Sequence, residues 1–80
     1  MPRLFNAFSP DGETLASGGW DDNVKIWGLS DGSIRYWWPA HKNRVTSVAF
    51  SLDGKMLASG SIDKSVKVWR IPETILINAW

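Results

Sequence analysis

Apolar and polar residues alternate along most of this chain with a period close to two, as in half-buried β-strands. The clearest case is the run VTSVAF at residues 45–50, whose odd and even positions form the two sides of one strand. No stretch has the 3.6-residue spacing of an amphipathic helix. Strands are predicted at residues 4–8, 14–18, 24–27, 34–38, 45–50, 56–58, 66–69 and 75–80. The pattern therefore predicts an all-β chain.

Short polar segments separate the predicted strands. Pro10 suits the first central position of a type I turn, and Gly12 tolerates a positive φ. Asp53 and Gly54 form a dipeptide that is common between antiparallel strands. Other connections are expected at residues 20–23, 30–32, 39–44, 60–65 and 72–74, after an irregular start at residues 1–3. Strands joined by such short connections form antiparallel meanders.

The chain contains an internal repeat with a period of 42 residues. Of the 21 aligned positions from Ala7 to Trp27, 13 recur unchanged between Ala49 and Trp69. Two units follow, residues 1–38 and residues 39–80, each predicted to form a four-stranded antiparallel sheet. One sheet of this size cannot bury both of its faces. Because a β-propeller stacks such sheets around an axis, it is the predicted architecture.

Composition excludes several classes of protein. The chain has six tryptophans among 80 residues, and each buries on the order of 150–250 Å² when packed. It has no cysteine, so disulfides and thiolate metal sites are excluded. A net charge of +1 with interspersed signs gives no reason to expect nucleic acid or a membrane as partner. Neither a signal peptide nor a transmembrane run is recognisable, so a cytoplasmic protein is expected.

The phrase SxDGxxLASGSxDxxVKxW at residues 51–69 resembles the WD40 repeat, whose period lies near 40–45 residues. The resemblance covers nearly the whole chain. The signature dipeptides occur in altered form: Gly-His as Ala40-His41, and Trp-Asp as Trp27-Gly28 and Trp69-Arg70. The resemblance implies two four-stranded blades of a WD40-type β-propeller, with the histidine-containing loop belonging to the second blade.

In WD40 blades four side chains form a buried hydrogen-bonded tetrad. Matched by position, the resemblance gives this structural role to His41, Ser59, Asp63 and Trp69. Burial of a carboxylate is tolerable only when its oxygens are hydrogen-bonded, and the histidine and the turn amides offer donors. The first blade has three counterparts, because its histidine would precede Met1: Ser17, Asp21 and Trp27.

The residues His41, Ser59 and Asp63 are also the ingredients of a hydrolase triad. Catalysis would need an exposed nucleophile beside an oxyanion hole. Ser59 instead lies inside the extended run that begins at Met56 and stops at Gly60, and it lacks the G-x-S-x-G turn of a nucleophile elbow. A structural role is favoured over a catalytic one, and no enzyme is expected.

Other chemical interpretations are weaker. The pair Asp21-Asp22 with one histidine does not make a metal-ligand set and is better explained as a solvated turn. Gly18-Gly19 has no following Lys-Ser/Thr, so it is the end of a strand rather than a phosphate loop. The adjacent tryptophans at 37 and 38 favour packing over base stacking, with one of the two facing solvent. No cofactor or metal is expected.

The function that WD40 propellers mainly share is that of a rigid platform for protein partners. In the family, the loop before the first strand and the turn between the second and third strands share one rim. By position this putative partner-binding rim carries Trp20, Asp22, Lys42, Asn43, Arg44, Ile62 and Lys64. An aromatic residue in a polar turn is typical of an interface anchor, although Trp20 could equally lie flat on its own blade.

Two function classes remain open. The first is a non-catalytic protein–protein interaction module or scaffold, completed by self-assembly or by further repeats of a longer protein. The alternative is a ligand-binding or enzymatic propeller that uses the central channel. A channel site needs converging charges on the first strands, and residues 4–8 and 45–50 carry none. The interaction class is therefore favoured.

Two stacked blades leave two open sheet faces, so the chain is not expected to act as a lone monomer. We expect these faces to carry Leu15, Ile26, Leu57 and Val68. Either a homo-oligomeric ring or neighbouring WD40 repeats would cover them. Among rings, four copies are favoured and three come next, because propellers have about four to eight blades.

Overall fold

The structure, a computed structural model, describes residues 4–71 and 73–80. The expected irregular start at residues 1–3, and residue 72 of an expected turn, lie outside this part. The described chain is all β and contains no helix, so no helix is present that could cross a bilayer. The strands are β1 (Leu4–Phe8), β2 (Thr14–Gly19), β3 (Asn23–Gly28), β4 (Ile34–Pro39), β5 (Val45–Phe50), β6 (Met56–Ser61), β7 (Val66–Arg70) and β8 (Ile75–Ala79).

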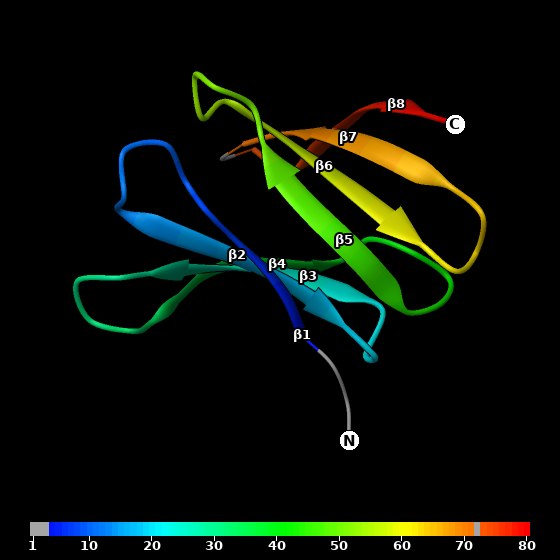
Figure 1. Ribbon diagram of the computed structural model, residues 1–80, viewed down its shortest axis with the longest axis horizontal. Coiled ribbons are helices and arrows are strands. Elements are labelled where there is room, and N and C mark those ends of the chain that lie inside the picture. The colour runs from blue at the N-terminus through cyan, green and yellow to red at the C-terminus, as the bar shows by residue number, and fades with distance from the viewer. Residues whose placement is uncertain (1–3, 72) are drawn as a thin grey trace.

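The strands form two antiparallel sheets of four, β1–β4 and β5–β8, each in meander order (Figure 1). The predicted fold class is confirmed. Several boundaries differ from expectation: β6 extends to Ser61, Asn23 begins β3, and Pro39 ends β4 opposite Asn23 in the ladder. Proline is tolerated there because β4 is an edge strand, whose outer side forms no ladder.

The turns after β1 and β5 share one hydrogen-bond pattern. Ser9 Oγ donates to Asp11 Oδ1 at 2.6 Å and accepts from the Thr14 amide at 3.0 Å. Gly12 follows with a φ of 73°, a conformation that costs glycine little. The second turn repeats the pattern with Ser51, Asp53, Gly54 and Met56. The recurring serine, aspartate and glycine thus explain why both hairpins form at the same place in the repeat.

Each sheet has two faces, because successive strand residues point to opposite sides. We call one the leading face, which in the first sheet carries Ala16, Gly18, Val24, Ile26 and Trp38. We call the other the tetrad face, which in the first sheet carries Leu15, Ser17 and Trp27 and in the second Leu57, Ser59 and Trp69. Within the chain, the leading face of the first sheet packs against the tetrad face of the second.

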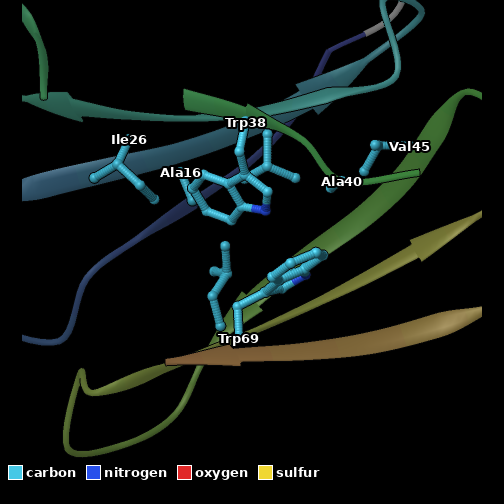
Figure 2. Close-up of a cluster of buried hydrophobic side chains, with 8 residues drawn as sticks. Ala16, Ile26, Trp38, Ala40, Val45 and Trp69 are labelled. Atoms are coloured by element: carbon cyan, nitrogen blue, oxygen red, sulfur yellow. The ribbon is translucent and has the colours of Figure 1, made fainter. Parts of the chain in front are cut away.

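The core lies between the two sheets. Trp38 and Trp69 meet there edge to face, with ring centroids 5.5 Å apart and an interplanar angle of 64° (Figure 2). β1 and β5, each the first strand of its sheet, lie beside each other, and we call this side of the sheets the inner edge (Figure 1). The expectation that Ile26 and Leu57 lie on open faces was wrong. They are 1% and 0% exposed, because the two faces that carry them cover each other.

Candidate functional site

The structure brings together the four residues of the second-blade tetrad. Ser59 lies on β6, Trp69 on β7, His41 in the loop before β5, and Asp63 in the turn between β6 and β7. Trp69 Nε1 donates to Ser59 Oγ at 2.9 Å, and the same oxygen lies 2.8 Å from His41 Nε2. On the other side of the ring, Nδ1 lies 3.0 Å from Asp63 Oδ2. A continuous chain of hydrogen bonds therefore runs from the core to the turn.

The partners of His41 determine where its proton lies. An ionised carboxylate only accepts hydrogen bonds, so Nδ1 carries the hydrogen and donates to Asp63. In a neutral imidazole with its hydrogen on Nδ1, Nε2 is an acceptor, so the Ser59 hydroxyl, whose oxygen accepts from Trp69, is the donor to Nε2. A neutral ring in this arrangement avoids the burial of a second charge at a residue only 6% exposed.

Asp63 is surrounded by donors from both sides of its turn. Its carboxylate accepts from the Lys42 amide at 3.1 Å, from the Ser65 amide at 2.9 Å and from the Ser65 hydroxyl at 2.5 Å. These bonds hold the pKa of the Asp63 carboxyl far below its ordinary value, although burial acts in the opposite direction. The bond from the Ser65 hydroxyl has the largest effect. Asp63 is therefore an ionised acceptor that ties the loop to the turn.

Two residues that the sequence analysis did not single out hold the same loop. Ser65 Oγ lies 3.0 Å from His41 Nδ1, and Lys67 Nζ donates to the Ala40 carbonyl at 2.9 Å. Lys25 stands at the same repeat position as Lys67, and this recurrence could have singled out the lysine from the sequence. No such signal existed for Ser65, whose repeat position is occupied by asparagine.

The first sheet holds part of the same network. Trp27 Nε1 donates to Ser17 Oγ at 2.8 Å, as its counterpart does in the second sheet. Asp21 accepts from the Asn23 amide at 3.2 Å and pairs with Lys25 Nζ at 3.4 Å. A cavity of about 260 Å³ is lined by Ser17, Gly18, Gly19, Asp21, Asn23, Lys25 and Trp27. No histidine reaches it from residues 4–71 or 73–80.

The geometry of Ser59 suits positioning rather than chemistry. The residue is 1% exposed, and its oxygen lies between the rings of His41 and Trp69. A nucleophilic serine must instead reach a substrate carbonyl beside oxyanion donors. What this arrangement does is fasten the loop at residues 40–42 to β6, β7 and the turn between them.

The seven residues assigned to the rim lie on three neighbouring connections. The Arg44 guanidinium carbon lies 4.0 Å from the centroid of the Trp20 ring. The His41 amide donates to the Asp22 carbonyl at 3.3 Å, and the Ile62 amide donates to the Arg44 carbonyl at 3.1 Å. Exposed side chains beside these contacts belong to Lys42, Asn43 and Lys64. Trp20 thus contacts an arginine of the loop before β5, and it is 47% exposed.

The remaining candidates stand as follows. Trp37 is 61% exposed and Trp38 is 8% exposed, so the prediction that one of the pair faces solvent is confirmed. Gly18 and Gly19 form the end of β2, as predicted. In the described part of the chain, no three histidine, aspartate or glutamate side chains gather as a potential metal-ligand set.

Comparisons with known proteins agree with this architecture. The family model described as "WD domain, G-beta repeat" matches residues 6–28 and 38–70. A 42-residue stretch, 52% of this chain, is 45% identical to the Periodic tryptophan protein 2 homolog of Dictyostelium discoideum and spans 5% of its length. The solved structure described as "Structure of U3-55K" matches 94% of this chain with a TM-score of 0.87 and 33% identity, and 23% of that chain is covered. With more than half of its residues matched by the family model and two stacked four-stranded blades, the chain belongs to the WD40 repeat family.

Proposed function

We propose that this chain is a non-catalytic protein–protein interaction scaffold whose two open sheet faces are covered by further WD40 blades. One observation carries the proposal: each open face is a repeat copy of a face that is already buried between the two blades. The leading face of the second blade repeats the one that packs inside the chain. The tetrad face of the first blade likewise repeats the face that receives it.

Side chains at the same repeat position differ in exposure between the covered face and the open face. Val24 is 0% exposed on the covered leading face, and its counterpart Val66 is 46% exposed on the open one. Trp38 is 8% exposed, and Trp80 at the same repeat position is 67% exposed. Apolar faces of this kind are typical of surfaces that bind a partner. A further blade with the same face would cover them in the way seen within the chain.

Two sources could supply the covering blades. A second copy of this chain has both faces, and so do further repeats of a longer protein. The relatives support the second source, since the chain spans only 5% of one and 23% of the other. The strands at the inner edge, β1 and β5, carry no charged residue, which argues against a catalytic or ligand site in a central channel.

The rim defined above is the proposed docking surface for other proteins. Tryptophan and arginine are the residues most often found as anchors of interfaces. The cation–π contact between Trp20 and Arg44 holds both side chains in place before a partner arrives, which lowers the ordering entropy of binding.

Sedimentation of the 80-residue chain at micromolar concentration tests the proposal. We expect association of the wild type and reduced association of Val66→Lys, because the substitution places a charge on a face that must be dehydrated. Leu52→Lys is the matched control, since Leu52 is 98% exposed in a turn and should leave association unchanged. A folded wild-type chain that stays a 9.0 kDa monomer would contradict the proposal.

A further inference from the structure

An open groove of about 690 Å³ lies between the two blades, at the strand ends opposite the rim. It is bounded by the turns after β1 and β5, which lie next to each other (Figure 1). The two turns approach closely, since a Cβ added at Gly54 would lie 3.6 Å from Pro10 Cδ. The volume falls in the range of roughly 300–1,000 Å³ that is typical of ligand pockets. Both sheets of one chain build this groove, so it does not depend on a further blade.

Apolar side chains from both sheets line the groove. Ile26 is 1% exposed, and Phe50 and Ile71 are half-buried against the core. Tyr36 on the edge strand β4 adds an aromatic ring and is 41% exposed. Such a lining favours contact with an apolar side chain, because the removal of apolar surface from water is favourable.

The charged residues that line the groove are all acidic: Asp11, Glu13 and Asp53. The hydrogen bonds that shape the two turns reach Oδ1 of each aspartate, and Glu13 takes part in them through its amide. Within residues 4–71 and 73–80, no basic side chain forms an ion pair with these three carboxylates. The whole chain has a net charge of +1, so this negative charge is a local property. A positively charged ligand is complementary to it.

Comparison of the two repeats separates what the fold needs from what this groove adds. Glu13 and Tyr36 do not recur in the second repeat, where Lys55 and Asn78 stand at their positions. The same hairpin and the same edge strand form in both blades. Neither element therefore requires an acidic residue or an aromatic residue at these positions. The combination belongs to the first blade of this chain and is not a feature of the repeat.

We propose that the groove binds a segment of a partner protein in which an arginine adjoins a large apolar residue. The guanidinium group donates charge-assisted hydrogen bonds to the carboxylates and stacks on Tyr36. The apolar residue contacts Phe50 and Ile71 and leaves water. Arginine suits the groove better than lysine, because its planar group both stacks on aromatic rings and bonds to carboxylates in pairs. The groove is a second docking surface, at the end of the blades opposite the rim.

The probe is the capped peptide Gly-Arg-Leu-Arg-Gly, titrated into the 80-residue chain. Tyr36 is the one tyrosine of the sequence, so a chain labelled with fluorotyrosine gives a single fluorine NMR signal, which reports on the groove. We expect this signal to shift to saturation with a Kd on the order of 0.1–1 mM, because ordering a short flexible peptide offsets much of its contact energy.

Two control peptides test the two halves of the ligand. Gly-Gln-Leu-Gln-Gly should bind roughly tenfold more weakly, because the charge-assisted hydrogen bonds are lost. Gly-Arg-Ser-Arg-Gly should bind about fivefold more weakly, because less apolar surface is removed from water. Added salt should weaken the arginine peptide and leave the glutamine peptide unchanged, since salt screens charges.

Two charge reversals in the protein locate the binding. Glu13→Lys should weaken the arginine peptide roughly tenfold, because a carboxylate of the groove becomes a cation. Lys55 at the same repeat position shows that this hairpin accepts a lysine. Glu73→Lys changes the net charge equally, but Glu73 does not line the groove, so the Kd should stay within about twofold. If Glu13→Lys does not fold, Glu13→Gln takes its place with an expected loss of about threefold.

A Tyr36 signal that does not move at millimolar peptide would overturn the proposal, as would equal binding of the three peptides. Equal losses in Glu13→Lys and Glu73→Lys would also overturn it, because the effect would then follow net charge and not the groove. The scaffold proposal is tested separately, by sedimentation without peptide. Its failure would leave the titration unaffected, because the groove lies within one chain.

Discussion

At the residue scale, the second blade depends on a buried network centred on His41. Removing one member leaves the others without a partner, so His41→Ala and Asp63→Ala should each destabilise the chain by about 1–3 kcal/mol. The double variant should lose less than the sum, because the two residues share one hydrogen bond. Urea or thermal unfolding of the three variants measures this coupling.

The first blade supplies the matched control for that cycle. Asp21 stands at the repeat position of Asp63, but its pairing with Lys25 is exposed, so Asp21→Ala should change stability by about 0.5 kcal/mol or less. Small, additive effects at His41 and Asp63 would show that the tetrad contributes nothing. Hydrolytic activity that disappears in Ser59→Ala would refute the structural role itself.

The lowered pKa of Asp63 makes the second blade sensitive to acid. The folded state binds the proton more weakly than the unfolded state, whose carboxyl titrates near 3.9. The stabilisation is therefore fully present above that pH and is lost as the pH falls further. We expect Asp63→Asn to be less stable than wild type at pH 7 and to lose less stability between pH 5 and pH 2.

Unfolding curves across that range decide the matter. Three other carboxyls also have lowered pKa values, those of Asp11, Asp31 and Asp53. The main cause is a hydrogen bond from a serine hydroxyl at Asp11 and Asp53, and one from the Ser33 amide at Asp31. Some acid sensitivity must therefore remain in the variant. If wild type and Asp63→Asn lost the same stability over the range, the Asp63 network would not be responsible.

At the element scale, the two blades approach closely where β2 faces β5. A Cβ added at Gly18 would collide with the side chain of Val45, which is fully buried and branched and cannot move aside. Gly18→Ala should therefore destabilise the chain by about 1–3 kcal/mol, as overpacking of a core does. Thermal unfolding gives the value.

Gly60 occupies the same repeat position in the second blade and is the control for Gly18. A Cβ there would come within 2.6 Å of the Ser47 hydroxyl, which can rotate away because it ends a short side chain. Gly60→Ala should therefore cost clearly less than Gly18→Ala. Equal losses would mean that the cost comes from the strand and not from the contact between blades.

At the scale of the whole molecule, the stacking is head to tail, because the leading face of one sheet meets the tetrad face of the other. Repeated between identical chains, such contacts close into a ring or grow without end. Rings of three or four copies, giving six or eight blades, fall in the range of known propellers. In the sedimentation experiment they would have masses of about 27 or 36 kDa, given 9.0 kDa for one chain.

The sequence by itself determined the elements of this protein. Alternation with a period of two placed all eight strands, and no boundary moved by more than three residues. The 42-residue repeat showed that the strands form two equivalent sheets and which residues correspond between them. These features depend on local pattern and on comparison of the chain with itself, so no knowledge of packing was needed.

Only the tertiary structure decided which faces meet. Alternation separates the two sides of a strand but does not say which side a neighbouring sheet covers, so Ile26 and Leu57 were wrongly expected on open faces. The contacts of Lys67 with the Ala40 carbonyl and of Arg44 with Trp20 join residues 24 or more positions apart. Such contacts arise when two sheets and their loops are brought together, and a one-dimensional pattern carries no record of that geometry.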